Sequence, residues 1–360
     1  EEPIFVHRYG EAETHESMRF LPAGEHKLRV WAGDNGAASV RKLIVRAVPA
    51  MMWCGFPVSS CAGYGNYDFD FLGKDVLPNV NTIVGEAKED DPKHRQLQKQ
   101  WQERGGQWFV EEHIPSIRRL AKAADGTPAF PDIPDPITAD YLYNWWTRGD
   151  SKEHGSALRN RNPYLDGIFQ DEFYLTTEDR EHLAYGEAFK RFAQDKEFEN
   201  KALHAFIGGD LYADAMGREL VRAVISAGYK VAWETYFPEM PTEALARDYL
   251  YCEARREIGR LEQAFPGIMK DMIVVLAFFT TPSLSLNVNP AVDFKVWLDM
   301  QYNYLANAPE CSGLYGVMIY HASLADEETV RWAGRLFRHY CIEGKRTMLS
   351  DELGFKYIPG

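Results

Sequence analysis

The chain has 360 residues, of which 45% are hydrophobic and 26% are charged, so it is suited to one large globular domain or two smaller ones. Its 53 acidic residues outnumber its 40 basic residues, which gives a formal net charge of -13. Nucleic acids and anionic membrane surfaces are therefore excluded as expected partners, because clusters of Lys and Arg supply most of the attraction to phosphates. No apolar run approaches the roughly 18 residues that a membrane span needs, so we expect no transmembrane helix.

The first 48 residues predict β structure. Residues 26–32 and 41–46 alternate apolar and polar side chains on either side of a Gly-Asp-Asn-Gly turn signal at residues 33–36. This pattern is typical of a β-hairpin. We expect residues 1–48 to be a β-rich segment that resembles the end of a β-sandwich, with an N-terminal cap on the following domain as the alternative.

Residues 49–360 alternate short hydrophobic runs with longer segments of helical period, as in a parallel sheet with helical crossovers. The eight runs of strand length are 50–56, 80–85, 107–111, 167–171, 204–207, 230–234, 272–279 and 314–321. The segments with helical period are 114–124, 178–195, 212–227, 242–265, 294–306 and 327–342. Eight such units predict an α/β protein with a (β/α)8 TIM barrel. An open doubly wound sheet is the alternative, but no GxGxxG follows any of the runs.

One connection, residues 126–163, is unusually long for a plain loop. Its first part is rich in proline, and its second part carries an aromatic cluster that includes Trp145 and Trp146. Loops of this length in compact domains are often functional, so these two rings are expected to shape a cleft. The alternative is a helix that packs its aromatic side chains on the barrel wall.

The predicted strands end in acidic residues. Reactive side chains of a TIM barrel follow the carboxyl ends of its strands. The residues at those ends are Glu86, Glu111, Glu112, His113, Asp171, Glu172, Glu234, Tyr320 and His321. Carboxylates that converge at a barrel mouth are costly to desolvate unless they are paired, hydrogen-bonded or protonated. The pattern therefore predicts acid–base chemistry or a metal site.

The fourth run carries the most specific local pattern. Residues 164–173, Tyr-Leu-Asp-Gly-Ile-Phe-Gln-Asp-Glu-Phe, resemble the fourth strand of many glycoside hydrolase barrels, in which Asp-Gly opens the strand and a carboxylate closes it. In the amylase-like and dextranase-like families the carboxylate five residues after the first Asp is the nucleophile, which implies that role for Asp171. Where the fourth strand ends in Asn-Glu, the Glu is the acid/base, which implies Glu172, with Asp171 replacing the Asn. The chain departs from this second group because residues 274–281 end without its usual nucleophile.

Glu234 is the expected second carboxylate, because residues 230–236 pass from a hydrophobic run directly into an aromatic and polar segment. Hydrolysis of a glycosidic bond needs one carboxyl group to protonate the leaving oxygen and another to attack the sugar or activate water. Burial beside Trp233 and Tyr236 is expected to raise the pKa of Glu234, which suits a proton donor. Some retaining barrels resemble this chain in placing the nucleophile on strand four and the acid/base on strand six.

The predicted substrate is a poly- or oligosaccharide, because aromatic faces stack on sugar rings and acidic side chains bind hydroxyl groups. The residues expected to bind it are Glu86, Glu111, Glu112, His113, Trp145, Trp146, Trp233, Tyr236, Tyr320 and His321. For each aromatic residue, packing in the core is the alternative. We thus predict a glycoside hydrolase with a retaining mechanism, with Asp171, Glu172 and Glu234 as catalytic residues and without a cofactor. We expect it to be secreted or periplasmic, although the first residues lack a signal-peptide pattern, so any export signal has been removed or never existed.

Two other functions are compatible with the same strand ends. A metal-dependent sugar isomerase or epimerase would use the carboxylates and imidazoles as ligands, although no HxH or HExxH spacing supports a metal. A barrel that binds glycan without catalysis would keep the aromatic rim and lose the paired acids. The sequence assigns no oligomeric state.

Overall fold

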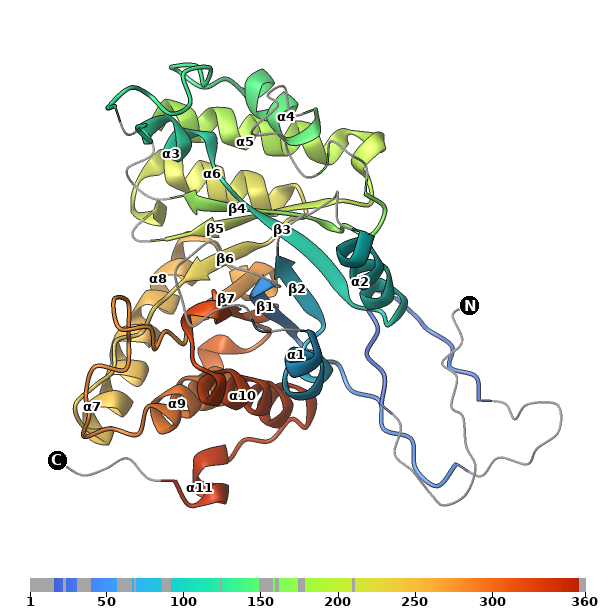
Figure 1. Ribbon diagram of the computed structural model, residues 1–360, viewed down its shortest axis with the longest axis vertical. Coiled ribbons are helices and arrows are strands. Elements are labelled where there is room, and N and C mark those ends of the chain that lie inside the picture. Colours follow the sequence, from blue (N-terminus) through green and yellow to red (C-terminus); the bar gives the residue numbers. More distant parts are fainter. Residues whose placement is uncertain are drawn as a thin grey trace.

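The computed structural model describes residues 16–21, 24–30, 40–56, 67, 69–85, 92–123, 125–148, 158, 162–173, 179–208 and 211–355. Eight parallel strands close into a barrel in which each strand pairs with its neighbours in sequence and β8 pairs with β1. Figure 1 shows the strands in the middle of the molecule, with α3–α6 on one side and α7–α10 on the other. The predicted (β/α)8 barrel is confirmed.

The strands coincide with the eight hydrophobic runs of the sequence. They are β1 (Ala50–Phe56), β2 (Thr82–Gly85), β3 (Gln107–His113), β4 (Gly167–Phe173), β5 (Ala202–Ile207), β6 (Val231–Glu234), β7 (Met272–Ala277) and β8 (Gly316–Tyr320). Parallel strands of such a barrel are covered on both faces, so they are apolar almost throughout rather than alternating. Every residue of β7 is buried, for example.

The helices are α1 (Phe69–Asp75), α2 (Pro92–Glu103), α3 (Pro115–Leu120), α4 (Ala139–Thr147), α5 (Asp179–Gln194), α6 (Ala215–Ser226), α7 (Glu243–Asp248), α8 (Arg255–Ala264), α9 (Phe294–Asn307), α10 (Glu327–Leu336) and α11 (Leu349–Leu353). Helices α3 and α5–α10 lie in the segments of helical period, whereas α1, α2, α4 and α11 lie outside them. A π-helical stretch, Tyr249–Ala254, joins α7 to α8. The side chains of Asp214, Asp293 and Asp326 accept backbone N–H groups in the first turns of α6, α9 and α10, which is why these helices begin there. No helix among the described residues is long and apolar enough to span a membrane.

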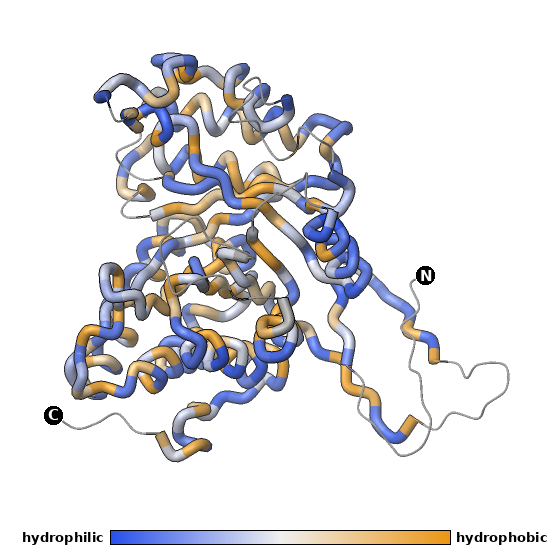
Figure 2. Tube along the Cα trace, in the orientation of Figure 1, coloured by the Kyte–Doolittle hydropathy of each residue, from blue (hydrophilic) through white to orange (hydrophobic). Residues whose placement is uncertain are grey.

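Side chains alternate between the inside of the barrel and the layer under the helices. Phe109, Phe169 and Phe206 belong to a small apolar cluster inside the barrel, whereas Trp53 and Trp108 pack in the larger cluster beneath the helices. Figure 2 shows hydrophobic residues concentrated along the central strands. The last residues of the strands lie two positions after these inward-facing residues, so their side chains point into the barrel mouth.

The Asp-Gly pair that opens β4 has a packing reason. A Cβ atom added at Gly167 would lie 1.8 Å from the carbonyl oxygen of Ala202 at the start of β5. Only glycine permits this approach, and its φ of 157° is also one that other residues rarely adopt. The preceding Asp166 accepts a hydrogen bond from the backbone N–H of Trp108 at 2.7 Å, which ties β4 to β3.

The predicted N-terminal hairpin is not formed in the described residues. Residues 24–30 and 40–49 contain no strand, and the turn signal at residues 33–36 lies outside the described residues. The apolar side chains of Leu28, Val30, Leu43 and Val45 are exposed. A two-stranded ribbon gains little stability when no third strand or helix covers its apolar face, so alternation alone does not produce the hairpin. The predicted division between residues 48 and 49 stays a prediction.

The N-terminal segment contacts the barrel at the end where the strands begin. The guanidinium of Arg338 lies 2.8 Å from the Glu16 carboxylate, and Arg19 donates to the backbone carbonyl of Arg104, which precedes β3. In Figure 1 the described stretches before β1 project away from the barrel. This segment therefore lies at the opposite end from the acidic strand termini.

Candidate active site

Glu111 is an inward-facing residue near the end of β3. Its Oε1 accepts a hydrogen bond from the Tyr320 hydroxyl at 2.8 Å and lies 3.6 Å from Nε2 of His321. Its Oε2 accepts from the Cys54 thiol at 3.3 Å. Burial by itself would raise the pKa of Glu111, but the contacts with His321, Tyr320 and Cys54 outweigh it and lower that pKa. The site thus holds Glu111 in its ionised form.

Asp171 on β4 is the partner of His113 in the register of β3 and β4. Its Oδ2 lies 3.1 Å from Nδ1 of His113 and 3.5 Å from the Tyr320 hydroxyl. The Asp171 side chain is only 2% exposed, whereas that of His113 is 51% exposed. Burial raises the pKa of Asp171, and the hydrogen bond to Asp171 raises the pKa of His113. The pair therefore reaches from the barrel interior to solvent.

Glu172 is placed beside Asp171 by an irregularity in β4. Neighbouring residues of a regular strand point to opposite faces. Here the register with β5 shifts between Gln170 and Phe173, and Glu172 has a left-handed φ of 76°. As a result, ligating atoms of His113, Asp171 and Glu172 all lie within 4.8 Å of one another. Glu172 is half-buried, and burial raises its pKa.

Glu234 ends β6 and carries an aromatic neighbour. Its Oε1 accepts a hydrogen bond from the Tyr236 hydroxyl at 2.5 Å. The Tyr236 ring stacks on that of Tyr320 at a centroid distance of 5.9 Å and an interplanar angle of 19°. Since Tyr320 also contacts Glu111 and Asp171, residues from β3, β4, β6 and β8 belong to one contiguous arrangement at the mouth.

Four residues predicted to bind substrate lie elsewhere or outside the described part. The structure corrects the prediction that Trp145 and Trp146 shape a cleft: both are buried, and Trp146 packs in the wall against Phe189 of α5. Trp233 is also buried, and it belongs to the cluster beneath the helices rather than to the mouth. Glu86 lies outside the described residues.

Glu112 differs from its neighbour Glu111. It alternates to the helix-facing side of β3, opposite the fully buried Gln170 of β4, and its charge acts on Arg118 of α3. A role for Glu112 in substrate binding stays a prediction.

Sequence reasoning missed Cys54 as a member of the site. Its position on β1, two residues after the inward-facing Met52, was the available signal, because that phase brings it to the mouth. Burial raises the pKa of Cys54, so it contacts Glu111 as a thiol.

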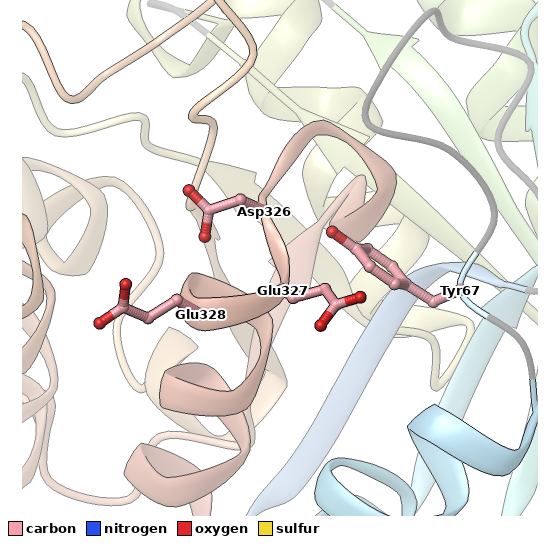
Figure 3. Close-up of a pocket in the computed structure, with 4 residues that line it drawn as sticks. All are labelled: Tyr67, Asp326, Glu327 and Glu328. Atoms are coloured by element: carbon pink, nitrogen blue, oxygen red, sulfur yellow. The ribbon is translucent and has the colours of Figure 1, made fainter.

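A separate pocket of about 410 Å³ lies at the start of α10 and is lined by Tyr67, Asp326, Glu327 and Glu328. Figure 3 shows Glu327 directed toward Tyr67, with Asp326 and Glu328 pointing away from it. Asp326 caps α10, and Glu328 pairs with Lys295. These acids have structural partners, so the carboxylates at the barrel mouth are the better candidates for chemistry.

No family model and no curated protein sequence matches the chain. Solved structures similar to it include an endo-β-N-acetylglucosaminidase from Cordyceps militaris, with 14% identity over 81% of this chain and 90% of that chain and a TM-score of 0.46. The C-terminal domain of a putative chitinase from Desulfitobacterium hafniense DCB-2 has 10% identity, coverage of 81% and 99%, and a TM-score of 0.47. A sugar phosphate isomerase/epimerase from Parabacteroides distasonis has 8% identity, coverage of 81% and 96%, and a TM-score of 0.41.

The similar structures thus include barrels of glycoside hydrolases and of a sugar phosphate isomerase/epimerase. Identities this low concern the fold alone, and TM-scores below 0.5 identify neither a substrate nor the role of any residue.

Proposed function

We propose that this barrel is a glycoside hydrolase that cleaves a poly- or oligosaccharide, with Glu172 and Glu234 as its two working carboxyl groups. The observation that carries the proposal is the arrangement at the mouth: Glu172 lies beside Asp171 on β4, and Tyr320 contacts both Asp171 and the ring of Tyr236, which donates to Glu234 at the end of β6. Two carboxyl groups on either side of a bound sugar are what glycosidic hydrolysis requires.

Glu172 has the properties of the proton donor. Burial raises its pKa, and although the charge of His113 opposes this and that of Asp171 adds to it, the pKa stays above that of a free glutamate. Asp171 is too deeply buried to contact a sugar, so its proposed role is to position His113 and to favour protonation of Glu172. This assignment chooses Glu172 over Asp171 for contact with the substrate, and it makes Glu172 rather than Glu234 the acid.

Glu234 is then the second carboxylate. The hydrogen bond from the Tyr236 hydroxyl to Oε1 fixes the orientation of the group. An ionised carboxylate here attacks the anomeric carbon in a retaining mechanism, as the sequence predicted, or activates water in an inverting one. Proton NMR of the freshly released sugar distinguishes the two, because retention yields the original anomer first.

The surroundings of the carboxyl groups support a carbohydrate without negative charge. Tyr236 is 37% exposed and stacked on Tyr320, so it offers a flat ring beside Glu234 on which a sugar can stack. The carboxylates of Glu111, Asp171 and Glu172 lie within one electrostatic group and would repel uronate or sulfate groups.

The test is hydrolysis of a panel of 4-methylumbelliferyl glycosides and neutral polysaccharides by the parent, Glu172→Gln and Glu234→Gln. Each substitution is expected to lower kcat/KM about 10³-fold, because loss of acid–base or nucleophilic catalysis costs about two to four orders of magnitude. Glu103→Gln, at the C-terminal end of α2 and so at the opposite end of the barrel from Glu111, is the control and is expected to retain parental activity.

Three outcomes would contradict the proposal. Full activity in Glu172→Gln or Glu234→Gln would remove the residue from its role. Glycan binding by a parent that hydrolyses nothing would favour the non-catalytic barrel. Turnover that disappears with EDTA and returns with a divalent ion would favour a metal-dependent sugar isomerase or epimerase.

A further inference from the structure

Three side chains with different ligand chemistry converge at the carboxyl ends of β3 and β4. The register of the two strands places His113 directly beside Asp171, and the irregular turn of β4 at Glu172 adds a second carboxylate. One ligating atom from each residue lies within 4.8 Å of the others. Tetrahedral ligands at about 2.0–2.2 Å from one Zn²⁺ ion lie about 3.3–3.6 Å from one another, so the set closes when the side chains of the exposed His113 and the half-buried Glu172 rotate inward.

Asp171 supplies a second observation that is independent of this spacing. Its side chain is 2% exposed, and its Oδ1 is buried without a hydrogen-bond partner among the described residues. Its other oxygen, Oδ2, already contacts His113 and Tyr320. A buried carboxylate oxygen that lacks any partner is costly, and such atoms in folded proteins require an explanation such as an ion or a water molecule. A cation bound to Oδ1 would satisfy it.

The charge around these residues also favours a cation. Glu111 adds its charge to those of Asp171 and Glu172, and the basic side chains in contact with them, within the described part of the chain, are the imidazoles of His113 and His321. Neutral imidazole is a metal ligand, whereas protonated imidazole is not. A divalent ion would neutralise the excess charge more fully than the two histidines do.

We infer that His113, Asp171 and Glu172 form a binding site for a divalent transition-metal ion of the Zn²⁺ class. The imidazole ligand selects Zn²⁺ or Co²⁺ over Mg²⁺ and Ca²⁺, which prefer sites made of oxygen ligands alone. Three protein ligands leave the fourth position of a tetrahedral ion open to water or to a sugar hydroxyl. The site does not rest on the proposed hydrolase activity, because binding of the ion is measured without a substrate.

The experiment is calorimetric titration of ZnCl₂ into the full chain after EDTA treatment and removal of the chelator, followed by Co²⁺ titration monitored by visible absorption. We expect one Zn²⁺ per chain and no measurable binding of Mg²⁺. His113→Ala and Glu172→Gln are each expected to weaken Zn²⁺ binding by about tenfold or more and to abolish the Co²⁺ absorption bands. Both side chains are at least partly exposed, so these variants are expected to fold, which circular dichroism checks.

Two matched controls exclude binding elsewhere on the surface. Cys252→Ser removes an exposed free thiol, and Glu103→Gln removes an exposed carboxylate at the opposite end of the barrel. Both are expected to bind Zn²⁺ with parental affinity. Absence of Zn²⁺ binding in the parent, or equal affinity in the parent, His113→Ala and Glu172→Gln, overturns the inference.

The two proposals fail in different ways. If both hold, Zn²⁺ inhibits hydrolysis, because an ion on Glu172 prevents it from donating a proton. Binding of Zn²⁺ with the expected loss in His113→Ala, but without inhibition of hydrolysis, upholds the metal site and counts against Glu172 as the acid. Loss of hydrolysis in Glu172→Gln without any Zn²⁺ binding does the reverse.

Discussion

Charged residues have different partners at the two ends of the barrel. At the end where the strands begin, the ammonium group of Lys230 lies 2.6 Å from the Asp271 carboxylate, and His204 accepts a backbone hydrogen bond from Lys230 while burial lowers the pKa of its imidazole to about 3. Charges there are paired, and the buried imidazole is neutral. At the mouth, Glu111, Asp171 and Glu172 share two histidines and one tyrosine hydroxyl. One end is balanced for stability, whereas the other keeps an excess of negative charge that a substrate or ion can use.

Backbone conformation shows the same contrast. Among the described residues other than glycine, the positive φ angles belong to Glu172, at 76°, and His321, at 43°. Both residues lie at the mouth. Such conformations cost about 1–3 kcal/mol each and persist where the surrounding structure enforces them, most often at functional sites. The end that carries the charge excess is therefore also the end that carries the strain.

Replacing Glu172 by glycine tests the contrast most strongly. Glu172→Gly removes both the carboxyl group and the strained φ, so kcat/KM is expected to fall about 10³-fold while the free energy of unfolding rises by about 1 kcal/mol. Activity on the best glycoside of the panel and urea unfolding measure the two effects. Loss of stability together with activity would show that Glu172 supports the fold rather than the chemistry.

Substitution of Asp166, which lies at the end where the strands begin, is expected to change stability without changing activity. Burial raises its pKa to about 6, although the Trp108 N–H and Lys201 oppose the shift. Between about pH 4 and pH 6 the unfolded chain has released this proton while the folded chain keeps it, so stability falls as pH rises through that window. Asp166→Asn retains the hydrogen-bond acceptor and lacks the titration.

The expected result for Asp166→Asn is a shallower loss of unfolding free energy between pH 4 and pH 7, by about 2–3 kcal/mol relative to the parent, with kcat unchanged. Urea unfolding at several pH values measures it, and the difference between the two proteins cancels the other titrating groups. Parallel stability curves for parent and variant would show that Asp166 is ionised in the fold.

Glu111 and Glu112 offer a comparison within one strand. Glu111→Gln removes the carboxylate held by Tyr320, His321 and Cys54, and we expect kcat/KM to fall about 10²-fold. Glu112→Gln changes the helix-facing neighbour, so the expected fall is at most about threefold. The ratio of the two effects on the same substrate is the measurement. Equal effects would mean that Glu112 also contacts the substrate, as the sequence suggested.

Much of the fold and part of the site follow from the sequence alone. The eight hydrophobic runs locate the strands because a parallel strand is buried on both faces, and the strand ends locate Glu111, Asp171 and Glu234. The side on which Glu172 lies could not be predicted, because it depends on a shift in register between β4 and β5 that leaves no pattern in β4 itself. A strictly alternating strand would have sent Glu172 toward the helices.

Aromatic residues were the least predictable part of the site. The sequence does not distinguish Tyr236 from Trp146, because an aromatic ring can either stack on a sugar or pack in a core. The packing of α4 on α5 buries Trp146, whereas Tyr236, which follows β6, is exposed. The N-terminal segment shows the same limit, because alternation specifies a strand only where another element covers the apolar side.

The position of Tyr320 has a consequence for how events at the mouth are transmitted. Its hydroxyl has a single proton but lies within reach of two acceptors, 2.8 Å from Glu111 and 3.5 Å from Asp171. Rotation about one C–O bond is therefore enough to transfer the hydrogen bond from β3 to β4. A ligand that binds Asp171 weakens it as an acceptor for the Tyr320 hydroxyl, so the hydrogen bond from Tyr320 to Glu111 becomes stronger. Binding at β4 can therefore change the hydrogen bonding of β3 without any movement of the backbone.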